Sequence, residues 1–366
     1  MLKRIYLDNF RCLVNFELAV DSINLFLGPN GTGKSSVFDV LRKVQSLLSG
    51  NKVADLFKGS DLTRWQTSPT QRFELEIDGN GGSYKYELAI EHDKERQLAL
   101  VHYERLWFNN RPLLRFEPSG DVQLYRDDHS KGPMYPFDRS LSALASLPPR
   151  RENTRLIWFR RRMERFIIVQ IDPYIMAGES SGEASQLAAT MANFVSWYRY
   201  VYQDQGKAIE ITSVLREILD GFDHFKFVEA GERHRVLKAS FSGGNGDHDY
   251  RFNELSDGQR VLIALYTLIY YARSEDYTLC IDEPENFVAL PEIQPWLITL
   301  YDFCSDGELQ ALLVSHHPEL IDYLASSAGY WFERQCNAPV RVKRITEDKK
   351  GGLPISELVA RGWLHD

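Results

Sequence analysis

The sequence has few cysteines and no long apolar run. Its four cysteines (Cys12, Cys280, Cys304 and Cys336) are scattered, without C-x-x-C pairs or metal-ligand spacing, so we expect free thiols in a reducing cytoplasm. No apolar stretch approaches the roughly 18 residues that span a bilayer. The opening MLKRIYLDNF lacks the apolar segment of a secretion signal. These absences predict a cytoplasmic protein that has no membrane partner.

The sequence also lacks an excess of basic residues. It has 43 lysines and arginines against 51 aspartates and glutamates, and its formal net charge of -8 argues against a basic surface throughout. A local basic groove can still attract a polyanion. With 366 residues, 43% of them hydrophobic and 26% charged, the chain has the composition of a globular protein with one large domain or two ordinary ones.

Strand and helix patterns alternate in the last third of the sequence. TLCIDEP and LQALLVSHHP each have the pattern of a buried strand, and a helical pattern follows each of them. This alternation predicts an α/β fold with substantial parallel pairing in its sheet.

Residues 71–125 have a different pattern. RFELEIDGNGGSYKYELAIEH alternates in polarity around a glycine-rich turn, which is typical of a β-hairpin, and further short strands follow it. We therefore expect an antiparallel β region inserted after the first helix. We expect DDHSKGPMYPFD to be a loop, and residues 140–166 to be mostly helical after their two prolines.

A glycine-rich loop, FLGPNGTGKSS, lies between a buried strand pattern, INLFL, and an amphipathic helix pattern. Residues 28–35 fit G-x-x-x-x-G-K-[ST], whose backbone N–H groups cradle phosphates at the start of a helix. In this interpretation Lys34 reaches the β- and γ-phosphates of ATP, and the Ser35 hydroxyl binds Mg²⁺. The ATP-binding residues would be Gly28, Pro29, Asn30, Gly31, Thr32, Gly33, Lys34, Ser35 and Ser36.

Two carboxylates end the strand pattern of YTLCIDEPEN, at the edge of an α/β sheet where ligands bind. Asp282 would hold Mg²⁺ through water, and Glu283 would act as the general base toward the attacking water. The alternative is an acidic corner between strand and loop.

Two further segments have polar residues at an element end. LSDG stands at the start of an apolar helix pattern, where Ser256 would either help bind an anion or serve as an ordinary N-cap. The strand pattern of LQALLVSHHP ends in Ser315, His316 and His317, which would form either a phosphate-sensing loop or a polar loop end.

In this order the four segments resemble the ATP-binding-cassette (ABC)-type ATPase heads of the SMC, RecF and OLD group. GPNGTGKSS matches the Walker A motif, LCIDEPE the Walker B motif, LSDGQR the signature motif and VSHHP the switch-histidine loop. The opening IYLDNFRCLVNFEL is similar to the start of RecF-like and OLD-like proteins. DEPEN with LPEIQPWL is similar to standalone ATPases of the AAA_21 type, many of which belong to phage-defence systems.

The resemblance implies an ABC-type P-loop ATPase head with a mixed or parallel central sheet, an antiparallel β insertion and a helical lobe. The whole chain, residues 1–366, would be a single head. Residues 1–50 and 166–366 would form the nucleotide-binding core and the signature lobe. Residues 51–165 would form a β-rich insertion that ends in an arginine-rich helix.

The resemblance also implies a homodimer with two ATP molecules sandwiched between its heads. The signature of one chain, Ser256, Asp257, Gly258 and Gln259, would contact the γ-phosphate held by the other. His316 would sense that phosphate, and Arg11 is a further candidate for phosphate contact. Gln71 and Gln170 are both candidates for the Q-loop glutamine.

Two departures from the family pattern concern the dimer. Asp257 stands where transporter cassettes usually have glycine, and FVALPEIQ after DEPEN is about one residue longer than the usual segment and lacks its histidine.

Two functions follow from the resemblance. The first is an ATPase that controls a separately encoded effector, a nuclease, in antiviral defence. The second is a RecF-like DNA-binding clamp in repair. PPRRENTRLIWFRRRMERF has seven arginines, which would form either a DNA-binding stripe or a solvated helix face, and Arg160, Arg161 and Arg162 are its candidate DNA contacts.

Overall fold

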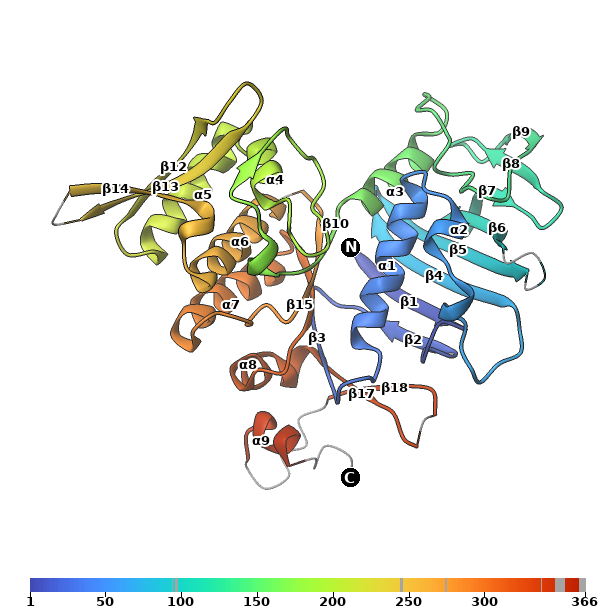
Figure 1. Cartoon of the computed structure of the whole chain (residues 1–366). Coiled ribbons are helices and arrows are strands. Elements are labelled where there is room, and N and C mark those ends of the chain that lie inside the picture. Colours follow the sequence, from blue (N-terminus) through green and yellow to red (C-terminus); the bar gives the residue numbers. More distant parts are fainter. Residues whose placement is uncertain are drawn as a thin grey trace.

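Three β-sheets, with helices between and around them, form the part of the chain that the computed structural model describes (Figure 1). That part comprises residues 1–93, 95, 98–243, 246–273, 275–336, 338–345 and 353–361. The segments 346–352 and 362–366, which the sequence assigns to the nucleotide-binding core, lie outside the described residues.

The central sheet has six strands, of which the first five are parallel and the last is antiparallel to its neighbour. Every residue of its second to fifth strands is buried, because helices cover both faces of the sheet. The predicted parallel α/β sheet is confirmed. In spatial order the strands are β10 (Phe166–Gln170), β15 (Thr278–Asp282), β16 (Gln310–Val314), β3 (Ile23–Leu27), β17 (Gly329–Glu333) and β18 (Arg341–Arg344).

Helix α1 (Lys34–Leu48) lies on one face of the central sheet and separates it from the second sheet (Figure 1). The predicted apolar stripe of α1 is buried along its whole length. Helices α6 (Asp257–Ala272), α7 (Leu290–Ser305) and α8 (Pro318–Ala328) lie on the other face. The two faces belong to two separate apolar cores, so the P-loop helix and the signature helix pack on opposite sides of one sheet.

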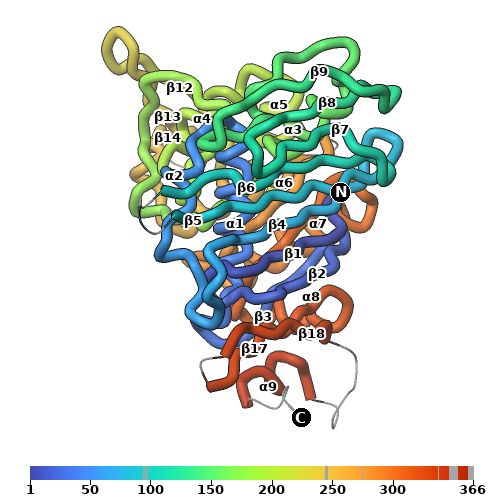
Figure 2. The backbone as a smooth tube through the Cα atoms, turned by 90° about the vertical axis from the view of Figure 1, so that its right-hand side faces the viewer, coloured from blue at the N-terminus to red at the C-terminus, as the bar shows by residue number. Residues whose placement is uncertain are grey.

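The second sheet is antiparallel and has eight strands, which Figure 2 shows running across the view. Helices α2 (Val53–Leu56) and α3 (Thr154–Glu164) pack against this sheet. In spatial order its strands are β2 (Phe16–Ala19), β1 (Leu2–Asp8), β4 (Thr70–Gly79), β5 (Gly82–Asp93), β6 (Leu98–Phe108), β7 (Arg111–Phe116), β8 (Asp121–Tyr125) and β9 (Lys131–Pro136).

Two features of this sheet differ from the sequence prediction. Strand β9 occupies the segment that was predicted to be a loop; it is an edge strand, where prolines are tolerated and no buried face imposes an apolar alternation. Strands β1 and β2, expected with the nucleotide-binding core, belong to this sheet, because β1 pairs with β4 from Leu2↔Ile77 to Asp8↔Arg72. The domain boundaries at residues 50 and 165 stay a prediction.

The third sheet projects from the helical side of the molecule (Figure 1). It contains β11 (Glu179–Ser180), β12 (Phe222–Glu229), β13 (Arg235–Gly243) and β14 (Gly246–Arg251), with α4 (Phe194–Val201) and α5 (Gln205–Ile218) packed nearby. A short helix, α9 (Ile355–Ala360), contacts α8. Among the described helices, none combines the length and apolar character needed to cross a membrane.

Candidate functional site

The loop after β3 leads into a helix whose first turn has no side-chain cap. Gly33 is the N-cap of α1, its φ is 90°, and no side chain bonds the first amides. A Cβ on Gly33 would lie 2.5 Å from Cys12 Sγ, and a Cβ on Gly28 would lie 2.2 Å from the Phe332 carbonyl oxygen. Glycine is therefore required at both positions. The open amides and the positive end of the helix dipole favour an anion at this point.

Lys34 curls back over this loop. Its buried Nζ donates hydrogen bonds to the carbonyl oxygens of Gly28, at 2.7 Å, and Pro29, at 3.1 Å. Burial lowers the pKa of the Lys34 ammonium, while the charges of Asp282 and Glu283 oppose that shift. The ammonium thus lies between the glycine loop and two carboxylates, where a bound phosphate would gain a close positive charge.

Ser35 and Asp282 meet at the carboxyl end of the central sheet. Asp282 is the last residue of β15, is buried, and lines the same cavity as Ser35. Burial raises the pKa of Asp282 and the charge of Glu283 raises it further, whereas Ser35, Lys34 and His316 lower it. A hydroxyl and a carboxylate side by side are oxygen ligands of the kind that Mg²⁺ takes from proteins.

Glu283 turns the chain away from the strand. Its backbone is left-handed, with φ 53°, and its N–H donates to the Val314 carbonyl oxygen at 2.8 Å. Its carboxylate accepts a hydrogen bond from Asn286 Nδ2 at 2.8 Å and lies on the wall of the cavity described below. This position allows Glu283 to accept a proton from a water molecule inside that cavity.

His316 lines the same cavity, on the loop after β16. Burial lowers the pKa of His316 and the charge of Lys34 lowers it further, whereas the carboxylates of Glu283, Glu285 and Asp282 raise it. The net pKa is below the usual value of 6.5, so the ring is neutral at pH 7.

Arg11 is fixed by two carboxylates at the rim. Its Nη2 lies 2.7 Å from Asp39 Oδ2, and its Nε donates to Asp61 Oδ1 at 3.2 Å. Asp61 is buried, and its Oδ2 also accepts a hydrogen bond from Lys43 Nζ at 2.8 Å. The predicted phosphate contact therefore has a defined position, held from α1 and from the loop before β4.

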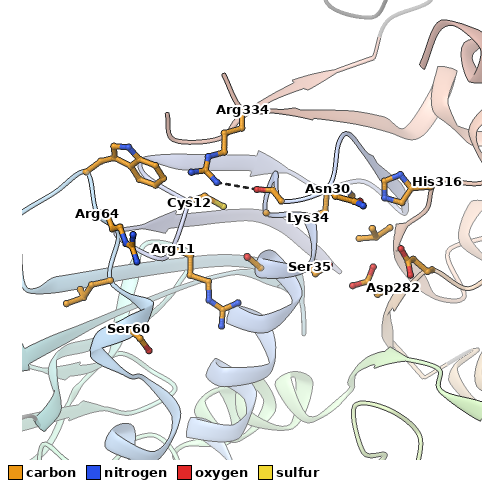
Figure 3. A pocket seen from close by; sticks show the side chains of 17 residues that line it. Arg11, Cys12, Asn30, Lys34, Ser35, Ser60, Arg64, Asp282, His316 and Arg334 are labelled. Atoms are coloured by element: carbon orange, nitrogen blue, oxygen red, sulfur yellow. Dashed lines mark hydrogen bonds between the residues drawn. The ribbon is translucent and has the colours of Figure 1, made fainter. Parts of the chain in front are cut away.

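These groups surround one cavity of about 590 Å³, within the size range of ligand sites (Figure 3). Of the predicted residues, Arg11, Asn30, Gly31, Gly33, Lys34, Ser35, Ser36, Asp282, Glu283 and His316 line it. Gly28, Pro29 and Thr32 are in the loop without lining the cavity. Sequence reasoning gave no role in the site to Cys12, Ser60, Leu62, Arg64, Trp65, Val314 and Arg334. Cys12 and Val314 stand within segments that carried the resemblance, whereas the other five belong to no motif.

The signature residues are not part of this cavity. Ser256 caps α6 within its own chain: its Oγ accepts a hydrogen bond from the Gln259 amide at 3.2 Å, and its N–H donates to Gln259 Oε1 at 3.1 Å. Asp257 forms an ion pair with Arg260. A Cβ on Gly258 would lie 2.9 Å from the carbonyl oxygen of Phe287, which places the helix start against the segment after the Walker B motif.

Two family models match the sequence. Residues 1–99 match AAA_15, described as "AAA ATPase domain", and residues 191–322 match AAA_21, described as "AAA domain, putative AbiEii toxin, Type IV TA system". No curated protein matches the sequence.

Solved structures resemble the chain over almost its whole length. The SMC head domain from Thermotoga maritima has a TM-score of 0.50 and 12% identity, covering 94% of this chain and 98% of that one. A crystal structure of an SMC head bound to the C-winged helix domain of ScpA has a TM-score of 0.56 and 9% identity, covering 96% of this chain and 99% of that one. At such identities the likeness establishes the fold, and the family models add the enzyme class. The chain has the fold of an SMC head domain, and its two matches to AAA-type ATPase families identify it as an ATPase.

In this ATPase head the two Q-loop candidates have different surroundings. Gln170 ends β10 and pairs in register with Asp282 on the neighbouring strand. Gln71 is buried in the antiparallel sheet, where its Nε2 donates to the Asn9 carbonyl oxygen at 3.0 Å and its Oε1 lies 2.9 Å from His92 Nε2. Gln71 is therefore committed to the interior, and Gln170 is the glutamine beside the Walker B carboxylate.

The arginines of α3 do not form a stripe on the ATPase head. Arg162 is buried and donates to Thr278 Oγ1 at 2.6 Å, so the prediction that it contacts DNA is wrong. Arg160 Nη1 donates to the carbonyl oxygens of Ala145 and Leu147. Arg161 is exposed. Arg160 and Arg162 are engaged within the fold because α3 packs against α1 and against strands of the two larger sheets.

Proposed function

We propose that this ATPase head works as a homodimer that closes around two ATP molecules and so controls a separately encoded effector, a nuclease, in antiviral defence. The main support for a dimer is that the signature residues, 256–259, do not line the cavity of their own chain. Residues 256–259 start a helix on the far side of the central sheet from α1, so a second copy is the source that completes each nucleotide site.

Within each site the triphosphate would lie along the glycine loop, Gly28 to Ser36, with Lys34 at its β- and γ-phosphates. Ser35 and Asp282 fit Mg²⁺, which would neutralise phosphate charge when it is bound. Glu283 would accept the proton of the attacking water, and neutral His316 would contact the γ-phosphate. Gln170, which pairs in register with Asp282 but does not line the cavity, would be the Q-loop glutamine.

The surface around the signature supports a protein partner. Tyr174, Phe287 and Leu290 are exposed apolar residues, and the rings of Tyr174 and Phe287 meet edge to face at 5.4 Å. Phe287 also contacts Gly258 through its backbone. An apolar surface next to the signature would be covered when a second head brings its cavity against Ser256. The ion pair with Arg260 would partly neutralise the charge of Asp257, so the Asp257 carboxylate would repel the incoming γ-phosphate less.

The role in defence is supported by the AAA_21 match, whose description names a toxin of a type IV toxin–antitoxin system. The structural relative bound to a ScpA domain is an ATPase head with a protein partner, which supports an effector docked on this one. Four free cysteines agree with the proposed cytoplasmic location. The RecF-like DNA clamp remains the alternative, but two of the three arginines expected to support it are engaged within the fold.

Glu283→Gln tests the dimer. With ATP and Mg²⁺ the variant should bind nucleotide, lose turnover and become a stable dimer by light scattering after gel filtration. Adding Ser256→Glu should leave binding intact and keep the protein monomeric, because a carboxylate would face the γ-phosphate across the interface. Wild-type turnover in the single variant, or an ATP-dependent dimer in the double variant, contradicts the proposal.

Co-purification distinguishes the two roles. The effector hypothesis predicts that the protein encoded next to this one binds the trapped Glu283→Gln dimer and is released on wild-type hydrolysis. The clamp predicts instead that the trapped dimer alone retains DNA under ATP, with a steep salt dependence. Retention of DNA without any protein partner would favour the clamp over the effector.

A further inference from the structure

The cavity has two chemically different ends. Figure 3 shows Lys34, Asp282 and His316 toward one end, while Arg64 and Arg334 lie at the other. The phosphate-binding chemistry is therefore concentrated at one end. A nucleotide whose phosphates occupy that end must direct its ribose and base along the cavity toward Arg64 and Arg334.

The far end has an aromatic ring that no motif accounts for. Trp65 lines the cavity and is 37% exposed, so part of its ring is accessible to a ligand. The guanidinium of Arg334 lies over the indole, 5.0 Å from the ring centroid. Apart from His316 at the phosphate end, Trp65 is the one aromatic side chain among the residues that line the cavity.

Arg334 joins this ring to the phosphate loop. Its Nε donates to the Ala338 carbonyl oxygen at 2.9 Å, and its Nη1 contacts the Gly31 carbonyl oxygen at 3.5 Å. Gly31 is inside the Walker A loop, and Trp65 follows Arg64 on the segment before β4. The planar guanidinium of Arg334 therefore contacts both Gly31, which would hold a phosphate, and Trp65, which would face the base.

We propose that Trp65 and Arg334 form the nucleobase platform of this site, on which a purine stacks while the triphosphate lies on the glycine loop. The inference rests on the proposed nucleotide site and assigns its base end. Indole and guanidinium planes both stack on bases, and the guanidinium adds donors for acceptor atoms at the edge of a purine. Stacking accepts any purine face, so the platform contributes affinity more than choice of base.

The test compares ATP with inorganic tripolyphosphate, which has the phosphates and no base. Binding is measured by calorimetry in the presence of Mg²⁺, in the Glu283→Gln background so that ATP is not consumed. Trp65→Ala should weaken ATP binding roughly fivefold or more and leave tripolyphosphate binding unchanged. Trp65→Phe, which retains a smaller ring, should recover part of the loss.

Intrinsic fluorescence gives a second readout that is independent of turnover. ATP should change the tryptophan emission of the parent protein, and Trp65→Phe should remove that change. Trp107→Phe is the matched control, because Trp107 is half-buried on β6, under Lys85, and does not line the cavity. It should leave the ATP-dependent change in place.

The possible results separate the two claims. If Trp65→Ala weakens ATP and tripolyphosphate equally, or weakens neither, the platform is wrong while the phosphate site stands. If the parent protein binds neither ligand, the nucleotide site itself is wrong and the platform fails with it. Loss of the fluorescence change in the Trp107 variant, with Trp65 intact, would also overturn the assignment.

Discussion

Glu285 accepts a hydrogen bond from the Ser315 hydroxyl at 2.7 Å, and the same oxygen lies 3.1 Å from the His316 backbone nitrogen that donates to it. Glu285 and Ser315 are both buried. The Walker B segment thus holds the loop that presents His316 to the cavity. Sequence reasoning gave Glu285 no role, since its partner lies 30 positions along the chain.

Ser315→Ala should lower turnover about tenfold and change ATP affinity little. The variant removes the bond to Glu285 and the bond that Ser315 Oγ accepts from the His317 amide at 3.0 Å, so His316 loses its fixed orientation. A loss of about 1.4 kcal/mol in transition-state stabilisation corresponds to that factor. Steady-state kinetics and calorimetry measure the two quantities. A tenfold loss of ATP affinity with unchanged kcat would contradict the assignment.

Gly258→Ala should weaken ATP-dependent dimerisation at least about tenfold without affecting ATP binding by the monomer. The added methyl group would lie 2.9 Å from the Phe287 carbonyl oxygen, so the start of α6 or the segment after the Walker B motif must shift. Gly182→Ala is the control, because no atom lies within 4 Å of its added Cβ. Sedimentation velocity in the Glu283→Gln background measures the dimer. Equal dimerisation of both variants would remove the signature from the interface.

Lowering the pH should reduce turnover only below pH 6.5 if His316 must be neutral. Burial and the charge of Lys34 lower the pKa of His316, so the neutral ring persists through pH 7, and acid adds a second cation beside Lys34. His316→Gln should be slower and should lose this part of the kcat profile. Any acid limb that it retains would come from the carboxyl groups of the site, which include the general base Glu283 and Asp282, whose pKa is raised by burial. If kcat fell in the same way at low pH in the wild-type protein and in His316→Gln, His316 would not be the source of the pH dependence.

Asp61→Asn should lower the free energy of unfolding by about 2 kcal/mol at pH 7, since it removes a buried anion from Lys43 and Arg11. Burial raises the pKa of Asp61, but Lys43, the Lys58 amide and Arg11 bring it below 3.8. The stabilisation is therefore present above pH 3.8 and is lost as the pH falls through the lower folded-state pKa. Chemical denaturation across this range measures it. A constant difference down to pH 2 would show that ionisation of Asp61 contributes nothing.

Much of the phosphate end was predictable because its residues are adjacent in sequence. β3, the glycine loop and α1 form one continuous segment, and the strand and helix patterns on either side placed the loop correctly. Asp282 and Glu283 followed in the same way from the end of a buried strand. The roles given to these residues, and to Ser256, stay predictions until nucleotide binding is measured.

The sequence by itself determined the parallel sheet, the loop that opens onto a helix start, and the carboxylates at the strand end. Each of these features belongs to a single strand, loop or helix. The spacing of apolar side chains and the positions of glycines reflect the environment of that one element. Only the tertiary structure decided that Arg162 is buried, that β1 pairs with β4, and that Trp65 and Arg334 face one cavity. Those relationships join segments that are tens to hundreds of residues apart in the sequence. They are determined by packing between helices and strands, and such packing leaves no periodic pattern in the sequence.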